Sequence, residues 1–278
     1  MSILDVSGLT KIYPAFMLDG VSFSLEAGKI TGFIGRNGAG KSTTLSSLFN
    51  FVHPDGGDVK FFGLPFAGNE AEIKRRTGFV SGGVDFYLKK RLSTISDVTK
   101  SFYPNWDDAA YRRYMEMFSL DGCKTPSELS AGMKVKYALI LALSHNAELL
   151  VLDEPTSGLD PVSRDDLLDV LLALCDEGKT ILFSTHITSD LDKCAQNIIY
   201  IRNGNIIADA PMRVFEDSYR IIAYRNDEGD ADERYFLGRR RMRDGFTALV
   251  RASDAQIIGR KCEKPDLESI MVHLEKGV

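Results

Sequence analysis

Alternating apolar and polar positions mark the first part of the chain. Residues 3–34 follow a period of two, with turn signals at Asp19-Gly20 and Ala27-Gly28. This alternation predicts antiparallel strands that lead into a short apolar strand at 30–34. Glycines and prolines between 56 and 65 punctuate a second short β region. We therefore expect an antiparallel β subdomain at the start of the chain.

The middle of the chain changes to helical spacing and then to strands that alternate with helices. From about 92 to 147 apolar residues recur at helical intervals, and one predicted core-facing helix face is formed by Tyr111, Tyr114, Met115 and Phe118. Between 148 and 203 the pattern predicts an amphipathic helix at 167–175 and buried strands at 149–152, 180–184 and 198–201. Such alternation is typical of an α/β protein whose mainly parallel sheet carries helices on both faces.

The composition shifts after Pro211. A polar, acidic segment at 226–233 precedes the arginine-rich run 239–243, and short apolar runs stand at 247–250 and 256–258. We interpret residues 212–278 as a small appended α+β module, rich in β-structure, that ends in a helix at Asp266–Glu275. The arginine run favours the solvated face of a hairpin, although it would also suit an acidic partner or lipid head groups.

The overall composition is that of a globular protein, and it limits the possible classes of function. The chain has 278 residues, is 44% hydrophobic and carries a net charge of −5, which argues against general nucleic-acid binding. No apolar run approaches the roughly 20 residues that span a bilayer, and residues 1–5 show no signal-peptide pattern. Four dispersed cysteines favour idle thiols in a reducing cytosol over metal ligation.

A glycine-rich segment joins the predicted strand at 30–34 to a helix-like stretch. It reads Gly35, Arg36, Asn37, Gly38, Ala39, Gly40, Lys41, Ser42, Thr43. The glycines let the backbone fold around an anion, and the helix start supplies free N–H groups and a positive dipole end. Lys41 adds a point charge for the β- and γ-phosphates, and Ser42 offers its hydroxyl to Mg²⁺. A chance match in a turn is the weaker alternative, so we predict a nucleotide site.

Two acids and a histidine follow buried strands further along the chain. Asp153 and Glu154 end the apolar run 149–152, and His186 follows the run 180–184. Two carboxylates at a buried strand end are costly unless a cation or a reaction needs them. We expect Asp153 to hold Mg²⁺, Glu154 to polarise the attacking water, and His186 to contact the γ-phosphate or that water. Solvent-exposed acids and a structural histidine are the alternatives.

A second candidate anion site lies before the apolar helix that starts near 131. Ser130 is placed as a helix N-cap, followed by the backbone N–H groups of Ala131 and Gly132. A serine followed by glycine is also a common helix start, so this segment alone indicates little.

In their order along the chain, these segments resemble the nucleotide-binding subunit of ABC transporters. The corresponding motifs are Walker A (35–42), signature (129–133), Walker B (149–153), D-loop (157–160) and the H-loop His186. The resemblance covers residues 1 to about 210. It implies a P-loop NTPase core at 1–211 with a helical signature subdomain at about 84–147. Tyr13 looks like the aromatic residue that stacks on adenine, although it would also suit strand packing.

The resemblance implies an ATP- and Mg²⁺-dependent hydrolase that powers transport. In this family two subunits sandwich ATP head to tail, so Ser130 and Gly132 would meet a γ-phosphate bound to the second ATPase subunit. The partner would be an integral-membrane permease on a separate chain, with this chain on the cytoplasmic side of the cell membrane. Within the family the chain resembles export ATPases. A soluble ABC-type ATPase with a regulatory or mechanical role is the alternative.

The chain departs from the family pattern in two segments. The signature has Ala131 in place of the usual Gly and Met133 in place of the usual Gln. Alanine still presents its backbone N–H, so we expect function to persist. No Gln stands in the segment Ser81–Asp85, where the Q-loop glutamine is expected. Asp85 is the nearest acid, and the residue that takes over this role is left open.

Overall fold

A computed structural model describes residues 2–82, 85–225 and 232–277. Two compact units form within the chain. The first comprises Met1–His186 and Lys193–Asp209, and the second comprises Ile187–Asp192 and Ala210–Val278. The domain boundary that we expected after residue 211 stays a prediction.

The first unit is built on a six-stranded sheet, in the order β10-β9-β3-β8-β7-β6. Its strands are β3 (Ile30–Ile34), β6 (Thr77–Ser81), β7 (Leu149–Asp153), β8 (Thr180–Thr185), β9 (Asn197–Arg202) and β10 (Asn205–Pro211). The pairs β6–β7, β7–β8, β8–β3 and β3–β9 are parallel, as the alternating pattern predicted. Because parallel strands end at the same edge, the residues after β3, β7 and β8 come together there.

A second sheet in this unit is antiparallel, in the order β2-β1-β4-β5. Its strands are β1 (Ser2–Tyr13), β2 (Phe16–Glu26), β4 (Gly56–Phe61) and β5 (Leu64–Pro65). The turn expected at Asp19-Gly20 is wrong, because both residues lie inside β2. Gly20 takes a φ of 60° where the pairing with β1 shifts register, so this glycine marks a bulge. The turn at Ala27-Gly28 is confirmed.

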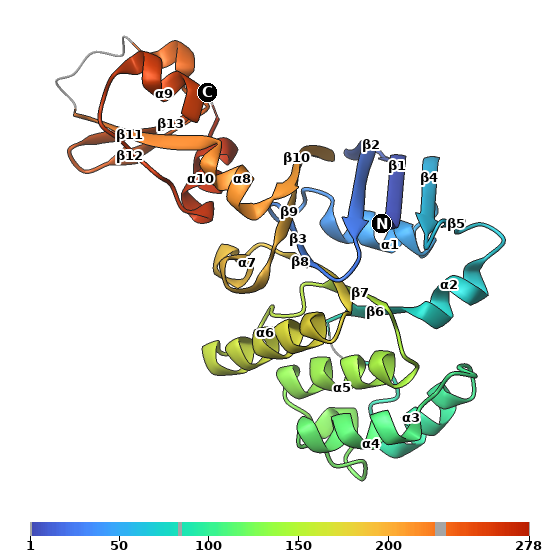
Figure 1. Ribbon diagram of the computed structural model, residues 1–278. Coiled ribbons are helices and arrows are strands. Elements are labelled where there is room, and N and C mark those ends of the chain that lie inside the picture. The colour runs from blue at the N-terminus through green and yellow to red at the C-terminus, as the bar shows by residue number, and fades with distance from the viewer. Residues whose placement is uncertain (1, 83–84, 226–231, 278) are drawn as a thin grey trace. The chain divides into compact units, whose positions relative to one another are not determined.

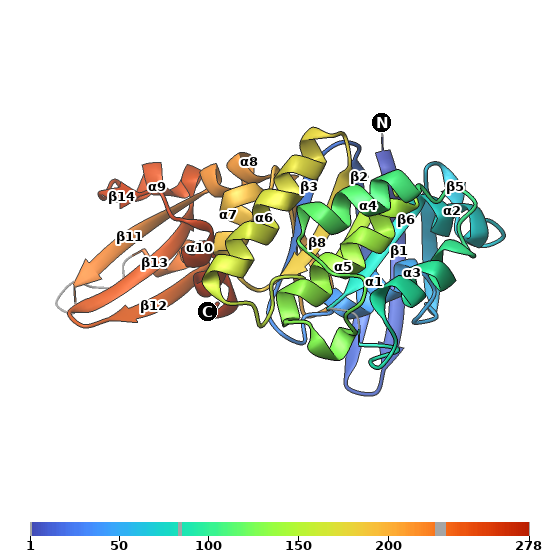
Figure 2. The ribbon, with the colours of Figure 1, turned by 90° about the horizontal axis from the view of Figure 1, so that it is seen from below.

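Helices cover both faces of the parallel sheet, as Figures 1 and 2 show. The helices of the first unit are α1 (Lys41–Leu48), α2 (Glu70–Arg76), α3 (Leu92–Lys100), α4 (Asp108–Met117), α5 (Ala131–Ser144) and α6 (Pro161–Asp176), with a 3₁₀ turn at Pro126–Glu128. Helix α7 (Thr188–Cys194) belongs largely to the second unit. Helices α3, α4 and α5 group together in both views, as expected for the segment 92–147. Tyr114, Met115 and Phe118 are buried, so the predicted core face of this segment is confirmed for these three residues.

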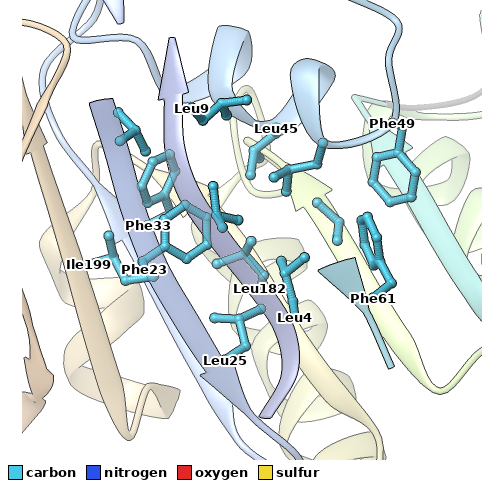
Figure 3. Packing of buried hydrophobic residues seen from close by; sticks show 14 of the residues in the cluster. Leu4, Leu9, Phe23, Leu25, Phe33, Leu45, Phe49, Phe61, Leu182 and Ile199 are labelled. Atoms are coloured by element: carbon cyan, nitrogen blue, oxygen red, sulfur yellow. The ribbon is translucent and has the colours of Figure 1, made fainter. Parts of the chain in front are cut away.

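The main core fills the space between the two sheets and around α1. Figure 3 shows Leu4, Phe23 and Phe61 from the antiparallel sheet packed with Phe33, Leu182 and Ile199 from the parallel sheet and with Leu45 from α1. The Phe23 and Phe33 ring centroids are 5.7 Å apart. Every residue of β3, β7 and β8 is buried, which explains their continuous apolar runs. This packing fixes the strand ends from which the site is built.

The second unit contains an antiparallel sheet in the order β12-β13-β11-β14. Its elements are α8 (Met212–Asp217), β11 (Tyr219–Arg225), a 3₁₀ turn at Glu233–Tyr235, β12 (Gly238–Met242), β13 (Gly245–Arg251), α9 (Ala252–Ile258), β14 (Cys262–Glu263) and α10 (Leu267–Glu275). Tyr224, Phe236 and Phe246 form the aromatic centre of its core.

Three sequence predictions can be compared with this second unit. The arginine-rich run lies on β12, which forms a hairpin with β13, and Arg240 and Arg241 are exposed as predicted. The final helix is also confirmed, since the Asp266 side chain caps it by accepting a hydrogen bond from the Ser269 N–H at 2.8 Å. The short apolar run 256–258 forms the end of α9. Residues 226–231 of the acidic segment lie outside the described residues.

Candidate functional site

The loop after β3 curls into the first turn of α1. Gly38 and Gly40 take φ angles of 82° and 113°, which L side chains rarely adopt, and the Ala39 N–H donates to the Arg36 carbonyl at 3.0 Å. The first turn of α1 holds no acidic side chain. The positive end of this helix is therefore open to an external anion. The strand, loop and helix expected for residues 30–48 are all present.

Two loop positions require glycine for space. A Cβ on Gly35 would lie 2.4 Å from the Ile201 carbonyl oxygen of β9, and a Cβ on Gly40 would lie 2.6 Å from the Leu18 side chain. Both neighbouring residues, Ile201 and Leu18, are fully buried. The loop can therefore pack this closely against β9 and β2 only without side chains at these positions.

Lys41 is the buried cation of the loop, with 6% of its side chain exposed. Its Nζ donates to the Gly35 carbonyl at 2.8 Å and lies 3.1 Å from Oε1 of Glu154. The ammonium group therefore links the two ends of the loop to the carboxylate that follows β7. This arrangement holds a positive charge at the cavity that the loop residues line.

Asp153, at the end of β7, lies 8% exposed among hydroxyl groups. Its Oδ1 accepts hydrogen bonds from Ser42 Oγ at 3.1 Å and from Ser184 Oγ at 2.6 Å. The sequence predicted a meeting of Ser42 and Asp153, and the structure brings them together. Ser184 was not predicted as a site residue. Its sequence signal is a hydroxyl directly after the apolar run 181–183, next to the expected H-loop.

Glu154 stands in an unusual backbone conformation with a φ of 50°. Its N–H donates to Ser184 Oγ at 2.9 Å and lies 3.2 Å from the Ser184 carbonyl oxygen. Its Oε2 lies 2.8 Å from Nδ1 of His186. The carboxylate thus bridges Lys41 and His186, so the three residues that we expected to be catalytic lie within direct contact.

A cavity of about 620 Å³ opens over this group. Its lining comprises Tyr13, Ala15, Phe16, Arg36, Asn37, Gly38, Gly40, Lys41, Ser42, Thr43, Glu154, Ser157 and His186. Tyr13 is 39% exposed, so its ring is not consumed by strand packing. Ala15 and Phe16 were not predicted; they join the cavity because the hairpin between β1 and β2 turns at Pro14-Ala15 beside Tyr13.

Ser130 and Gly132 are not among the residues that line this cavity. Ser130 is exposed and caps α5 by accepting a hydrogen bond from the Met133 N–H at 3.2 Å. Gly132 is buried, and a Cβ there would meet Ser163 and Leu159 of the same unit at 3.5 and 3.6 Å. The expected helix start is confirmed, and its anion-binding role stays a prediction.

The segment in the Q-loop position leaves the end of β6 beside Asp153. Ser81 pairs in register with Asp153, and the Gly82 N–H lies 3.3 Å from the Asp153 carbonyl oxygen. Asp85 forms an ion pair with Lys134 of α5 at 2.8 Å. Its carboxylate is therefore engaged on the helical side rather than at Asp153. Residues 83–84 lie outside the described residues, and the role of the absent glutamine stays unassigned.

Comparison with known proteins identifies the family. The ABC transporter family profile matches residues 18–157. The bacitracin transport ATP-binding protein BcrA of Bacillus licheniformis is 31% identical over 215 residues, which are 76% of this chain and 70% of that protein. The daunorubicin/doxorubicin resistance ATP-binding protein DrrA of Streptomyces peucetius is 29% identical over 269 residues, covering 94% and 81% of the two chains. This chain belongs to the ABC transporter family.

Solved structures agree with this assignment. An ATP-binding subunit of an ABC transporter superposes with a TM-score of 0.69 at 26% identity, covering 77% of this chain and 92% of that chain. The chain therefore has the P-loop NTPase fold and is the ATP-binding, ATP-hydrolysing subunit of such a transporter. A membrane permease is its partner in that assembly. Within the described residues, no helix has the length and apolar character needed to cross a membrane.

Proposed function

We propose that this chain powers export of a small molecule or peptide-like compound by hydrolysing ATP with Glu154 as the general base. The observation that carries the proposal is the contact of Lys41, Glu154 and His186 beside the glycine-rich loop. Relatives named for bacitracin transport, Nod factor export and daunorubicin resistance support export. They also favour this function over that of a soluble ABC-type ATPase. The chain would then be peripheral to the cytoplasmic face of the membrane through its permease.

The loop residues Gly35 to Thr43 would hold the phosphates of ATP. Their N–H groups and the start of α1 offer hydrogen bonds and a positive dipole end. A γ-phosphate would compete with Glu154 for the Lys41 ammonium group, which lies 3.1 Å from Oε1. Binding would therefore free the Glu154 carboxylate to accept a proton from water. Tyr13, at the mouth of the same cavity, would stack on the adenine ring.

Ser42 and Asp153 fit a magnesium site. Their oxygens lie 3.1 Å apart, and both are the hard ligands that Mg²⁺ prefers. Among the described residues, no group of three or more His, Cys, Asp or Glu side chains could hold a metal ion. The two oxygens of Ser42 and Asp153 suit a cation whose remaining ligands are substrate phosphates and water rather than protein groups. When bound, Mg²⁺ would neutralise phosphate charge during transfer.

His186 would orient the Glu154 carboxylate. Its Nδ1 lies 2.8 Å from Oε2, and its ring is 41% exposed toward the cavity. A general base must lie within hydrogen-bond reach of the proton it removes and must be held in that position. The opposite ring nitrogen would remain available for the γ-phosphate or the attacking water.

The signature segment would complete the site of a second ATPase subunit. Ser130 is exposed at the start of α5 and does not line the cavity of its own chain. A helix start whose first residues, Ser130 and Ala131, are exposed suits a phosphate that arrives from outside. We therefore expect ATP to hold two subunits head to tail, as a homodimer or heterodimer.

The permease would dock beside the cavity between β6 and α5. This cavity has a volume of about 260 Å³, and Phe86 and Tyr103 line it. The side chain of Phe86 is exposed, and further exposed apolar side chains adjoin the lining residues in the chain, namely Tyr87 and Leu88 after Phe86 and Phe102 before Tyr103. A group of exposed apolar residues near a small cavity is typical of protein interfaces.

Sedimentation of a Glu154→Gln variant tests this function. With ATP and Mg²⁺ the variant should accumulate as a nucleotide-bound dimer, because the carboxylate that removes the water proton is lost while the phosphate contacts remain. The same variant with Lys41→Ala added is the control and should stay monomeric. A Glu154→Gln chain that remains monomeric at saturating ATP would contradict head-to-tail dimerisation.

A further inference from the structure

Ser184 lies at the centre of the site although it does not line the cavity. It is on β8, between the strands that carry the loop and the two acids, and is fully buried. A hydroxyl group in the middle of a parallel sheet is costly unless it is hydrogen-bonded. Alanine would fill this position without that requirement. The hydrogen bonds that the Ser184 hydroxyl forms must therefore explain why a serine stands here.

The Ser184 hydroxyl bonds to both acidic residues at once. It donates to Oδ1 of Asp153 at 2.6 Å and accepts from the Glu154 N–H at 2.9 Å. The direction of each bond is fixed, because a carboxylate oxygen only accepts and an amide N–H only donates. One hydrogen and one lone pair of the hydroxyl are thus used. Rotating the Ser184 side chain would break both bonds together.

These two bonds act on different parts of the reaction. The bond to Asp153 and the bond from Ser42 converge on the same oxygen, which fixes the orientation of the carboxylate. The Glu154 N–H bonds to the Ser184 hydroxyl at 2.9 Å and more weakly to the Ser184 carbonyl oxygen at 3.2 Å. The shorter bond helps to hold a residue whose φ of 50° is unfavourable for a side chain with a Cβ. In that conformation the Glu154 carboxylate reaches both Lys41 and His186.

We propose that Ser184 is a positioning residue that holds Asp153 and Glu154 in the orientation needed for ATP hydrolysis. The proposal rests on the function proposed above, in which Asp153 holds the metal ion and Glu154 acts as base. Ser184 does not line the cavity in which the nucleotide would bind, so its effect is indirect. Residues that orient metal ligands in this way are worth about 10- to 100-fold in activity or metal affinity.

Steady-state ATP hydrolysis of Ser184→Ala tests this role. We expect kcat to fall at least 10-fold and the Mg²⁺ concentration for half-maximal activity to rise severalfold. ATP binding measured without Mg²⁺ should stay within about 2-fold, because the glycine-rich loop and Lys41 are untouched. Ser184→Thr keeps the hydroxyl and should recover most of the rate.

Ser144→Ala is the matched control. Ser144 is also fully buried, and its hydroxyl donates to the Ile140 carbonyl at 2.6 Å within α5, away from the acids. It should lower the melting temperature about as much as Ser184→Ala while leaving kcat and the Mg²⁺ requirement unchanged. If both variants lose activity in proportion to their melting temperatures, Ser184 is merely structural and the proposal is wrong.

Further outcomes of the same assays also bear on the proposal. A Ser184→Ala enzyme with wild-type kcat and Mg²⁺ dependence overturns the proposal, as does a Ser184→Thr enzyme that folds normally yet is as slow as the alanine variant. If the added methyl group unfolds the threonine variant, the comparison with Ser144→Ala decides alone.

An assay of Glu154→Gln separates this proposal from the proposed function. Full activity of Glu154→Gln refutes the role of Glu154 itself. Inactivity of Glu154→Gln beside an active Ser184→Ala refutes only the role of Ser184.

Discussion

Replacing Gly35 with alanine should separate the packing of the glycine-rich loop from the stability of the fold. The new Cβ would lie 2.4 Å from the Ile201 carbonyl oxygen, whereas ordinary contact begins at 3.4 Å. Either the loop or strand β9 must therefore move by about 1 Å. Ile201 is fully buried in β9, and β9 is paired with β3. The loop is the part that can yield.

The displacement should reduce nucleotide binding more than stability. Overpacking of this kind costs about 1–3 kcal/mol of unfolding free energy. The hydrogen bond from Lys41 Nζ to the Gly35 carbonyl, 2.8 Å long, would be stretched at the same time. A misplacement of about 1 Å in a site can cost about 100-fold in function. We expect ATP affinity to fall at least 10-fold.

Titration of purified protein with ATP, together with urea denaturation, measures both effects. Gly63→Ala is the control, because Gly63 has a φ of 79° and open space around its Cβ direction. The left-handed conformation alone costs an alanine about 1–2 kcal/mol. The control should therefore lose similar stability and bind ATP normally. Wild-type affinity in a folded Gly35→Ala protein would refute the reasoning about the loop.

Two further predictions concern Tyr13 and His145. Tyr13→Ala should weaken ATP binding about 5-fold, because stacking on adenine is worth about 1 kcal/mol. Ile12→Ala is the control and should bind ATP normally, because it changes a neighbouring residue that is 61% exposed. Equal affinities of the two variants in a fluorescent-ATP titration would count against adenine stacking. Burial lowers the pKa of His145, whose ring stacks on Tyr103 at 3.9 Å. The His145 imidazole therefore binds a proton more readily in the unfolded chain than in the folded one. Its contribution to the free energy of unfolding is present above a pH of about 6.5 and is lost as pH falls through the folded pKa. Urea midpoints at pH 7.5 and 5.5 should differ more for the wild type than for His145→Gln, and an equal difference would be inconsistent with a buried neutral imidazole.

Local patterns were enough to predict the parts of the fold that depend on neighbouring residues. The strand, glycine loop and helix around Lys41 follow one another in the chain, so their sequence specifies them directly. The strands at 149–152 and 180–184 are apolar throughout because both faces of the sheet are covered. The common edge of parallel strands then predicted that Asp153, Glu154 and His186 would meet the loop.

Features that depend on strand register could not be predicted in this way. Ser184 contacts Asp153 because β7 and β8 pair residue for residue at that point, which no local pattern specifies. Gly20 was interpreted as a turn because a glycine at a bulge and a glycine at a turn both need positive φ. Residues 256–258 are too few and too apolar to distinguish a strand from the end of a helix.

Hydrolysis of ATP by a Glu154→Gln protein tests the central claim most directly. Among the residues that line the cavity, Glu154 is the one with a carboxylate, so it is the group best placed to receive a proton at this site. The measurement pairs the steady-state release of phosphate with a titration of ATP binding on the same preparation. We predict that binding stays within a few-fold of the wild type while hydrolysis falls at least 100-fold, an effect of the size expected for general-base catalysis. Wild-type hydrolysis by this variant would contradict the account.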